Sequence, residues 1–176
     1  MIDERLDPWI EGYLEYLRDV GRKAPRTIID YSESPYGRIV VTRECSQTSF
    51  FENGEHLFST PNIVESEEAV HFALLQRKNI DEVLLVTGGV GGTVREIMKY
   101  RPVRLDYVEL DPEIIDAASR HLKNSFPREV HLHAEDGRRF VRTTQFRYDA
   151  VIVDLPDPLS LQLNRFYTVQ FFREVR

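Results

Sequence analysis

Short apolar runs alternate with helical stretches from Glu82 towards the end of the chain. The runs are rich in Val, Leu and Ile, which is typical of strands buried in a parallel sheet. Between them, we expect helices to begin near Thr93, Pro112 and Arg138. The alternation predicts an α/β fold of the βαβαβαβ type, with helices on both faces of a parallel sheet. The predicted strands are residues 83–86, 105–108, 130–132 and 150–153.

The pattern has a different period upstream of this region. Residues 39–42 and 48–51 are β-branched and aromatic, and Asn53-Gly54 separates the second run from residues 56–58. Because Asn and Gly readily adopt positive φ, this spacing predicts a β-hairpin.

Two helices are expected around this hairpin. Asp7-Pro8 provides an N-cap followed by proline at the first helical position, and Gly21 provides a stop. Residues 65–77 contain no helix breaker and predict a second helix. We therefore expect a helical segment over 1–31, a β-hairpin unit over 32–64 and a Rossmann-like core over 65–176.

Composition narrows the class of protein. The chain has 23 Lys and Arg against 29 Asp and Glu, and its net charge of −6 disfavours nucleic acid and favours cationic ligands. The single cysteine, Cys45, excludes an intrachain disulfide and a cysteine-based zinc site, so we expect a cytoplasmic protein. No apolar run approaches the roughly 18 residues that span a bilayer, so we expect no membrane partner.

A glycine-rich loop follows the first strand of the predicted parallel sheet. Its glycines, with Gly88, Gly89 and Gly91 as candidate binding residues, let the backbone approach a ligand closely. The strict dinucleotide pattern is not met, because Val94 stands where its last glycine would be. Glu109 ends the second strand about 20 residues later, where a carboxylate can accept both hydroxyls of a ribose. Loop and acid together predict a nucleoside site, the alternative being that Glu109 is a solvated surface group.

Acidic residues follow the other predicted strands as well. Asp136 comes after the third strand and Asp154 after the fourth. Because the carboxyl ends of parallel strands share one edge of the sheet, these side chains and Glu109 should line one crevice. Neighbouring carboxylates repel one another unless a cation lies among them. The crevice therefore predicts a positively charged ligand, such as a sulfonium or an amine, or shifted pKa values.

Four motifs together resemble a known family, the polyamine aminopropyltransferases or spermidine synthases. The resemblance covers about residues 32–176 and is closest to the spermidine-synthase-like branch. The motifs are Ser34-Pro35-Tyr36-Gly37-Arg38-Ile39, Glu135-Asp136-Gly137, the run from Val151 to Pro158, and Phe166-Tyr167-Thr168 with Phe171-Phe172.

The resemblance implies a methyltransferase-like Rossmann core that binds decarboxylated S-adenosylmethionine as a co-substrate. By the same resemblance, Glu109 would hold the ribose of the donor, Asp136 and Gly137 its adenine, and His71 would contact it from the preceding helix. No metal is expected in this chemistry.

The resemblance also implies a polyamine or other small amine as the acceptor. Asp154 would take the proton from the attacking amine, and Asp157 would help to hold the polyamine. This role for Asp154 is chemically reasonable, because a protonated amine cannot attack the carbon next to a sulfonium. A homodimer is the expected assembly.

Several positions depart from the family pattern. Val90 stands in the loop where the family has an aspartate, Val70 where it has a substrate tyrosine, and Gly37 where it has a glutamine. The missing acid at position 90 removes a charge that would repel the carboxylate of intact S-adenosylmethionine. An S-adenosylmethionine-dependent methyltransferase is therefore one alternative function, and a non-catalytic nucleoside-binding or assembly module is another. The family continues beyond the helix in which this sequence ends, so we expect an incomplete core without its last strands.

Overall fold

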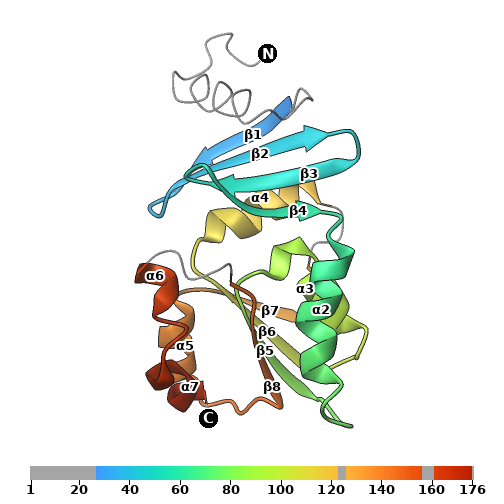
Figure 1. The fold of residues 1–176 in the computed structure, drawn as a ribbon, viewed down its shortest axis with the longest axis vertical. Helices are drawn as coiled ribbons and strands as arrows, with labels where there is room; N and C mark the ends of the chain where they lie inside the picture. Colours follow the sequence, from blue (N-terminus) through green and yellow to red (C-terminus); the bar gives the residue numbers. More distant parts are fainter. Residues whose placement is uncertain (1–26, 123–125, 156–160, 176) are drawn as a thin grey trace.

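Two sheets form this protein, an antiparallel sheet above a parallel one (Figure 1). The computed structural model describes residues 27–122, 126–155 and 161–175. The helix expected from Asp7 and the candidate residue Asp157 lie outside these residues. None of the helices in the described part of the chain has the length and apolar character needed to cross a membrane.

The antiparallel sheet has the strand order β1-β2-β3-β4. Asn53 and Gly54 both have positive φ, at 52° and 88°, and connect β3 to β4, which confirms the predicted hairpin. Strand β1 had not been expected, and it crosses the boundary proposed at residues 31 and 32 because it pairs along β2 with one irregularity in register. The strands are β1 (Thr27–Glu33), β2 (Arg38–Glu44), β3 (Gln47–Glu52) and β4 (Glu55–Thr60).

The parallel sheet contains the four strands predicted from the sequence, in the order β7-β6-β5-β8. Val86 in β5 is level with Val108 in β6 and with Val153 in β8, so the chain leaves these strands at the same edge of the sheet. This register brings the loops after the strands together. The strands are β5 (Glu82–Val86), β6 (Arg104–Glu109), β7 (Val130–Ala134) and β8 (Ala150–Val153).

Helices cover both faces of the parallel sheet, as predicted, with α2 and α3 on one side and α5, α6 and α7 on the other (Figure 1). Alternate side chains of β5 pack on opposite faces of the sheet. Val83 and Leu85 belong to one apolar cluster, and Leu84 and Val86 belong to the other. The helix expected over 65–77 is α2. The helices are α2 (Ile63–Leu74), the 3-10 turn η1 (Gly89–Gly91), α3 (Thr93–Met98), α4 (Pro112–His121), α5 (Gly137–Thr143), α6 (Leu161–Asn164) and α7 (Val169–Val175).

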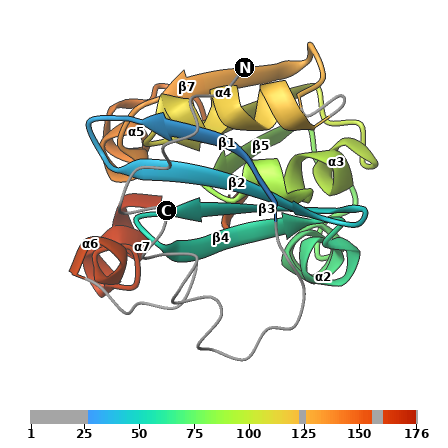
Figure 2. The same cartoon turned by 90° about the horizontal axis from the view of Figure 1, so that it is seen from above.

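Helix α4 lies under the antiparallel sheet and joins the two layers (Figure 2). Its N-cap is Asp111, whose Oδ1 accepts a hydrogen bond from the Glu113 backbone N–H at 2.9 Å. The other oxygen, Oδ2, accepts a hydrogen bond from the Ser34 hydroxyl at 2.5 Å. One apolar cluster fills the space between the layers and contains Ile39, Val41, Phe50, Phe58, Val90, Ile114, Ala117 and Ala118.

This cluster should contribute strongly to the free energy of unfolding, because it packs the antiparallel sheet against the rest of the protein. Phe50 is 0% exposed and stacks on Phe58 with ring centroids 4.4 Å apart. We expect Phe50→Ala to lower the free energy of unfolding by about 3–5 kcal/mol, because it leaves a cavity between the layers. Phe72→Ala is the matched control, since Phe72 is 76% exposed, and should change stability by less than about 0.5 kcal/mol. Urea denaturation followed by circular dichroism measures both, and equal losses would contradict the assignment of the core.

Candidate active site

The glycine loop turns sharply where β5 ends. Thr87 and Gly88 have positive φ, at 58° and 71°, and Gly92 follows η1 with φ 131°. A Cβ atom at Gly88 would lie 2.3 Å from Asp154 Oδ2, and one at Gly89 would lie 2.7 Å from the Tyr107 ring. Both distances are impossible for real atoms, so the loop needs glycine to pack against these two side chains. It therefore lies in direct contact with the residues at the ends of β6 and β8.

Glu109 is buried at the end of β6 rather than solvated, which excludes the alternative that it is a surface group. Its Oε2 accepts a hydrogen bond from the Tyr107 hydroxyl at 2.8 Å, and its Oε1 accepts one from the Leu110 backbone N–H at 2.9 Å. Burial raises the pKa of the Glu109 carboxyl to about 7, and the charges of Glu52 and Asp111 act in the same direction. Each oxygen keeps a second lone pair that can accept a hydroxyl of a ligand.

Asp154 follows β8 and is half-buried beside the loop. The Thr93 hydroxyl donates a hydrogen bond to its Oδ2 at 2.6 Å. Its backbone is held too, because its carbonyl oxygen accepts a hydrogen bond from the Thr87 hydroxyl at 2.8 Å. Burial raises the pKa of the Asp154 carboxyl, the Thr93 hydrogen bond opposes that change, and the charge of Glu65 adds to it. Asp154 is thus a carboxyl group with a strengthened affinity for a proton.

Asp136 lies at the same edge of the sheet, after β7, and caps helix α5. Its Oδ1 accepts a hydrogen bond from the Arg139 backbone N–H at 2.8 Å, and its Oδ2 is paired with the Arg165 guanidinium. Gly137 begins α5 in close contact with the sheet, since a Cβ there would lie 2.5 Å from Val86 Cγ1. The contact of these two residues with an adenine stays a prediction.

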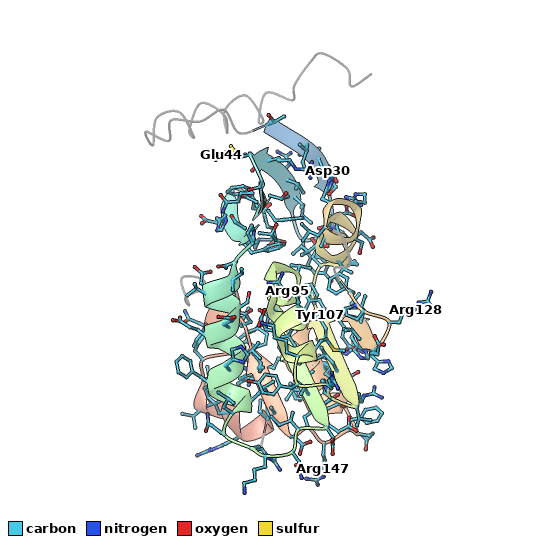
Figure 3. The ribbon with its side chains drawn as sticks, turned by 90° about the vertical axis from the view of Figure 1, so that its right-hand side faces the viewer. Asp30, Glu44, Arg95, Tyr107, Arg128 and Arg147 are labelled. Atoms are coloured by element: carbon cyan, nitrogen blue, oxygen red, sulfur yellow. The ribbon has the colours of Figure 1, made fainter. Side chains whose placement is uncertain are left out.

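Tyr107 connects the parts of the site, and sequence reasoning did not single it out. It is fully buried, lies against Gly89, donates to Glu109 and is close enough to Asp154 for their charges to interact. Figure 3 labels Tyr107 in the interior of the α/β layer, whereas Arg147 lies at the end of that layer far from the antiparallel sheet. The signal was the alternation along β6, because residues two apart share one face of a strand. Thr93 was missed as a partner of Asp154, although it directly follows the glycine loop.

The described contacts of His71 are with Glu96 on α3 and with Tyr100 just after it, and its contact with a donor stays a prediction. Its Nδ1 is 2.5 Å from the Tyr100 hydroxyl, and its Nε2 is 3.6 Å from Glu96 Oε2. His71, Glu67 and Glu96 are close enough together to be considered as metal ligands. However, the Lys99 ammonium forms an ion pair with Glu96 and lies 3.7 Å from Glu67 Oε1. The Lys99 ammonium therefore occupies the place of a metal ion between Glu67 and Glu96.

The positions that depart from the family pattern have structural roles here. Val70 lies on α2, is 0% exposed and packs in the apolar cluster between α2 and the parallel sheet. Val90 is 6% exposed and packs in the apolar cluster between the two sheets. At Gly37, a Cβ would lie 2.3 Å from Asn53 Nδ2. Val90 thus belongs to the connection between the layers.

Comparison with protein families identifies a match over most of the described chain. The spermine/spermidine synthase domain matches residues 62–176. A polyamine aminopropyltransferase of Korarchaeum cryptofilum is 32% identical over 181 residues, which is 95% of this chain and 56% of that protein. Polyamine aminopropyltransferase 2 of Aquifex aeolicus is 32% identical over 157 residues, covering 85% of this chain and 32% of that protein. The chain thus spans about half, or less, of the length of these curated relatives.

Solved structures show the same fold. A spermidine synthase in complex with the transition state analogue AdoDATO superposes with a TM-score of 0.76 at 24% identity, covering 84% of this chain and 53% of that one. The spermidine synthase of Thermotoga maritima gives a TM-score of 0.73 at 23% identity, covering 84% of this chain and 52% of that one. The predicted methyltransferase-like Rossmann fold with an N-terminal hairpin unit is confirmed.

The raised pKa of Glu109 should make the protein less stable at and above neutral pH than at acid pH. A rise from 4.5 to about 7 corresponds to about 3 kcal/mol at 1.36 kcal/mol per pKa unit. Between these values the folded state retains a proton that the unfolded state has lost, so stability falls as pH rises and then levels off above about pH 7. We expect Glu109→Gln to remove this component, with a gain of up to about 3 kcal/mol at pH 8 and little change at pH 4. Urea denaturation at both values measures it, and a variant that loses stability at pH 8 would disprove the assignment.

The location of Val90 predicts the effect of restoring an acid to the loop. Val90→Asp would place a carboxylate in the apolar cluster, and we expect it to lower the free energy of unfolding by at least about 2 kcal/mol. Val64→Asp is the control, because Val64 is 67% exposed, and should change stability by less than about 0.5 kcal/mol. If thermal denaturation shows Val90→Asp to be as stable as the control, the side chain at position 90 faces solvent or ligand instead.

Proposed function

Because this chain belongs to the spermine/spermidine synthase family, we propose that it transfers an aminopropyl group from decarboxylated S-adenosylmethionine to the amine of a polyamine. The observation that carries this proposal is the geometry at Asp154. A half-buried carboxyl group with a raised pKa lies against the glycine loop. Tyr107, which contacts the same loop, donates a hydrogen bond to Glu109, a buried acid suited to a ribose. This arrangement supports a base at Asp154 and a nucleoside site at Glu109 on either side of one loop.

The donor would bind along the carboxyl edge of the parallel sheet. The ribose hydroxyls would donate to the free lone pairs of Glu109, which accepts them best when it is ionised. Asp136 and Gly137 would hold the adenine, and the backbone of Gly88, Gly89 and Gly91 would allow the donor to approach closely. Since the pKa of Glu109 is about 7 without ligand, donor affinity should rise with pH through the neutral range.

The transfer itself is a substitution at the carbon bonded to the sulfonium. The nitrogen lone pair of a neutral amine forms the new C–N bond as the C–S bond breaks, and the electron pair of that bond goes to sulfur, leaving a neutral thioether. The proton lost by the amine goes to Asp154. Burial makes this carboxylate a stronger base than an exposed aspartate. Asp157 as a contact of the polyamine stays a prediction.

The negative charge at the carboxyl edge of the parallel sheet would favour the decarboxylated donor over intact S-adenosylmethionine. Although position 90 carries no acid, the charge of Glu65 acts on Asp154, and the charge of Glu52 acts on Glu109. A donor with its own carboxylate would be repelled by this group of acids, whereas an aminopropyl ammonium would be attracted. These observations support aminopropyl transfer rather than the methyltransferase alternative.

Two substitutions separate donor binding from turnover. We expect Glu109→Gln to weaken binding of decarboxylated S-adenosylmethionine at least tenfold, because charge-assisted hydrogen bonds are worth roughly 1.5–3 kcal/mol each. Asp154→Asn should bind the donor within about threefold of the original chain but lose at least about a hundredfold in transfer to linear diamines. The control, Asp116→Asn on the exposed side of α4, should change neither.

Calorimetry with the decarboxylated and intact donors, and chromatography of the amine products, measure these effects. Tighter binding of the intact donor together with methylated products would support the methyltransferase instead. Donor binding without any product would favour the non-catalytic module.

A further inference from the structure

We infer that Thr93 is a positioning residue that orients the carboxylate of Asp154 towards the attacking amine. This inference rests on the proposed function, since it gives Asp154 the role of the base. The residue carries no chemistry of its own, because it acts through Asp154.

The Thr93 hydroxyl lies where it can determine the side-chain conformation of Asp154. Thr93 is 2% exposed at the start of α3, and its hydroxyl is 2.6 Å from Asp154 Oδ2. Within the described part of the chain, it is the one side chain that donates a hydrogen bond to this carboxylate. A threonine at this position is rigid, because branching at Cβ restricts its rotamers.

The glycine loop confines the same oxygen from another side. A Cβ at Gly88 would lie 2.3 Å from Oδ2, so the loop is already as close to that atom as packing allows. The backbone of Asp154 is fixed by its N–H, which donates to the Val86 carbonyl at 3.1 Å, and by its carbonyl, which accepts from the Thr87 hydroxyl at 2.8 Å. With Oδ2 enclosed in this way, Oδ1 is the oxygen that can receive the proton of the amine.

The hydrogen bond also determines how much of Asp154 is ionised. A hydroxyl that donates to a carboxylate stabilises the charged form, so Thr93 opposes the effect of burial on the pKa. Among the residues that the structure describes, the other charged or titratable groups that act on Asp154 are Glu65 at the start of α2, which raises the pKa of Asp154, and Tyr107 on β6. Thr93 is thus the group that favours the state able to accept a proton.

The test compares Thr93→Val, which keeps the shape and removes the donor, with Thr93→Ser, which keeps the donor. Nuclear magnetic resonance of carboxyl-labelled aspartate, assigned with Asp154→Asn, follows the titration of Asp154 in each variant. We expect Thr93→Val to raise the pKa of Asp154. It should also lower kcat about tenfold, because it removes one hydrogen bond to a charged group. The KM for the donor should stay within about twofold of its original value. In Thr93→Ser, the pKa of Asp154 and kcat should stay close to their original values. Thr143→Val, which removes a hydroxyl from the exposed face of α5, should alter neither quantity.

Each outcome decides the inference. An unchanged titration or an unchanged kcat in Thr93→Val would overturn it, as would a loss of kcat that Thr93→Ser does not restore. If Thr93→Val fails to fold, Thr93→Ala removes the same donor with a smaller side chain. If the original chain transfers no aminopropyl group, the proposed function fails, and the titration alone then shows whether Thr93 controls the Asp154 carboxylate.

Discussion

The hydrogen bond from Tyr107 to Glu109 joins the core of this protein to its candidate active site. Tyr107 belongs to the apolar cluster beneath α2 and α3, yet its hydroxyl reaches the carboxylate at the end of the same strand. Its ring also lies against Gly89, so the loop, the acid and the core share one rigid side chain. The position of the Glu109 carboxylate therefore depends on the packing of the sheet. It is preorganised before a ligand binds.

Desolvation of buried carboxyl groups, with repulsion between neighbouring ones added to it, is the main electrostatic cost of this arrangement. Burial raises the pKa values of Glu52, Glu109 and Asp154, and each is raised further by a neighbouring carboxylate. Elsewhere, a buried acid is matched by cations, as for Asp106, whose two oxygens accept from the Arg104 guanidinium at 2.6 and 2.9 Å. Glu52, Glu109 and Asp154 have no such cation among the described residues that act on them, whereas Asp136 is paired with Arg165. A cationic substrate would offset this repulsion when it binds.

Much of this organisation could be predicted from the sequence, because it depends on local patterns. Strands β5 and β8 are continuous apolar runs. The acids at the carboxyl ends of parallel strands necessarily share an edge of the sheet, as Glu109 and Asp154 do. Strand β1 was missed because residues 27–33 contain no regular alternation, and their strand conformation depends on pairing with β2. The position of Val90 in the core depends on contacts with residues as distant in sequence as Ile39, which no local pattern reveals.

The glycines of the loop also bear on how members of this family should be compared. Gly88 and Gly89 are confined by Asp154 and Tyr107, which belong to the protein itself. A relative that no longer needed Asp154 would lose this constraint on Gly88, whereas Gly89 would still be required, since Tyr107 belongs to the core. Gly89 is thus a marker of the shared fold, whereas the acids and Thr93 bear on whether the proposed transfer is retained.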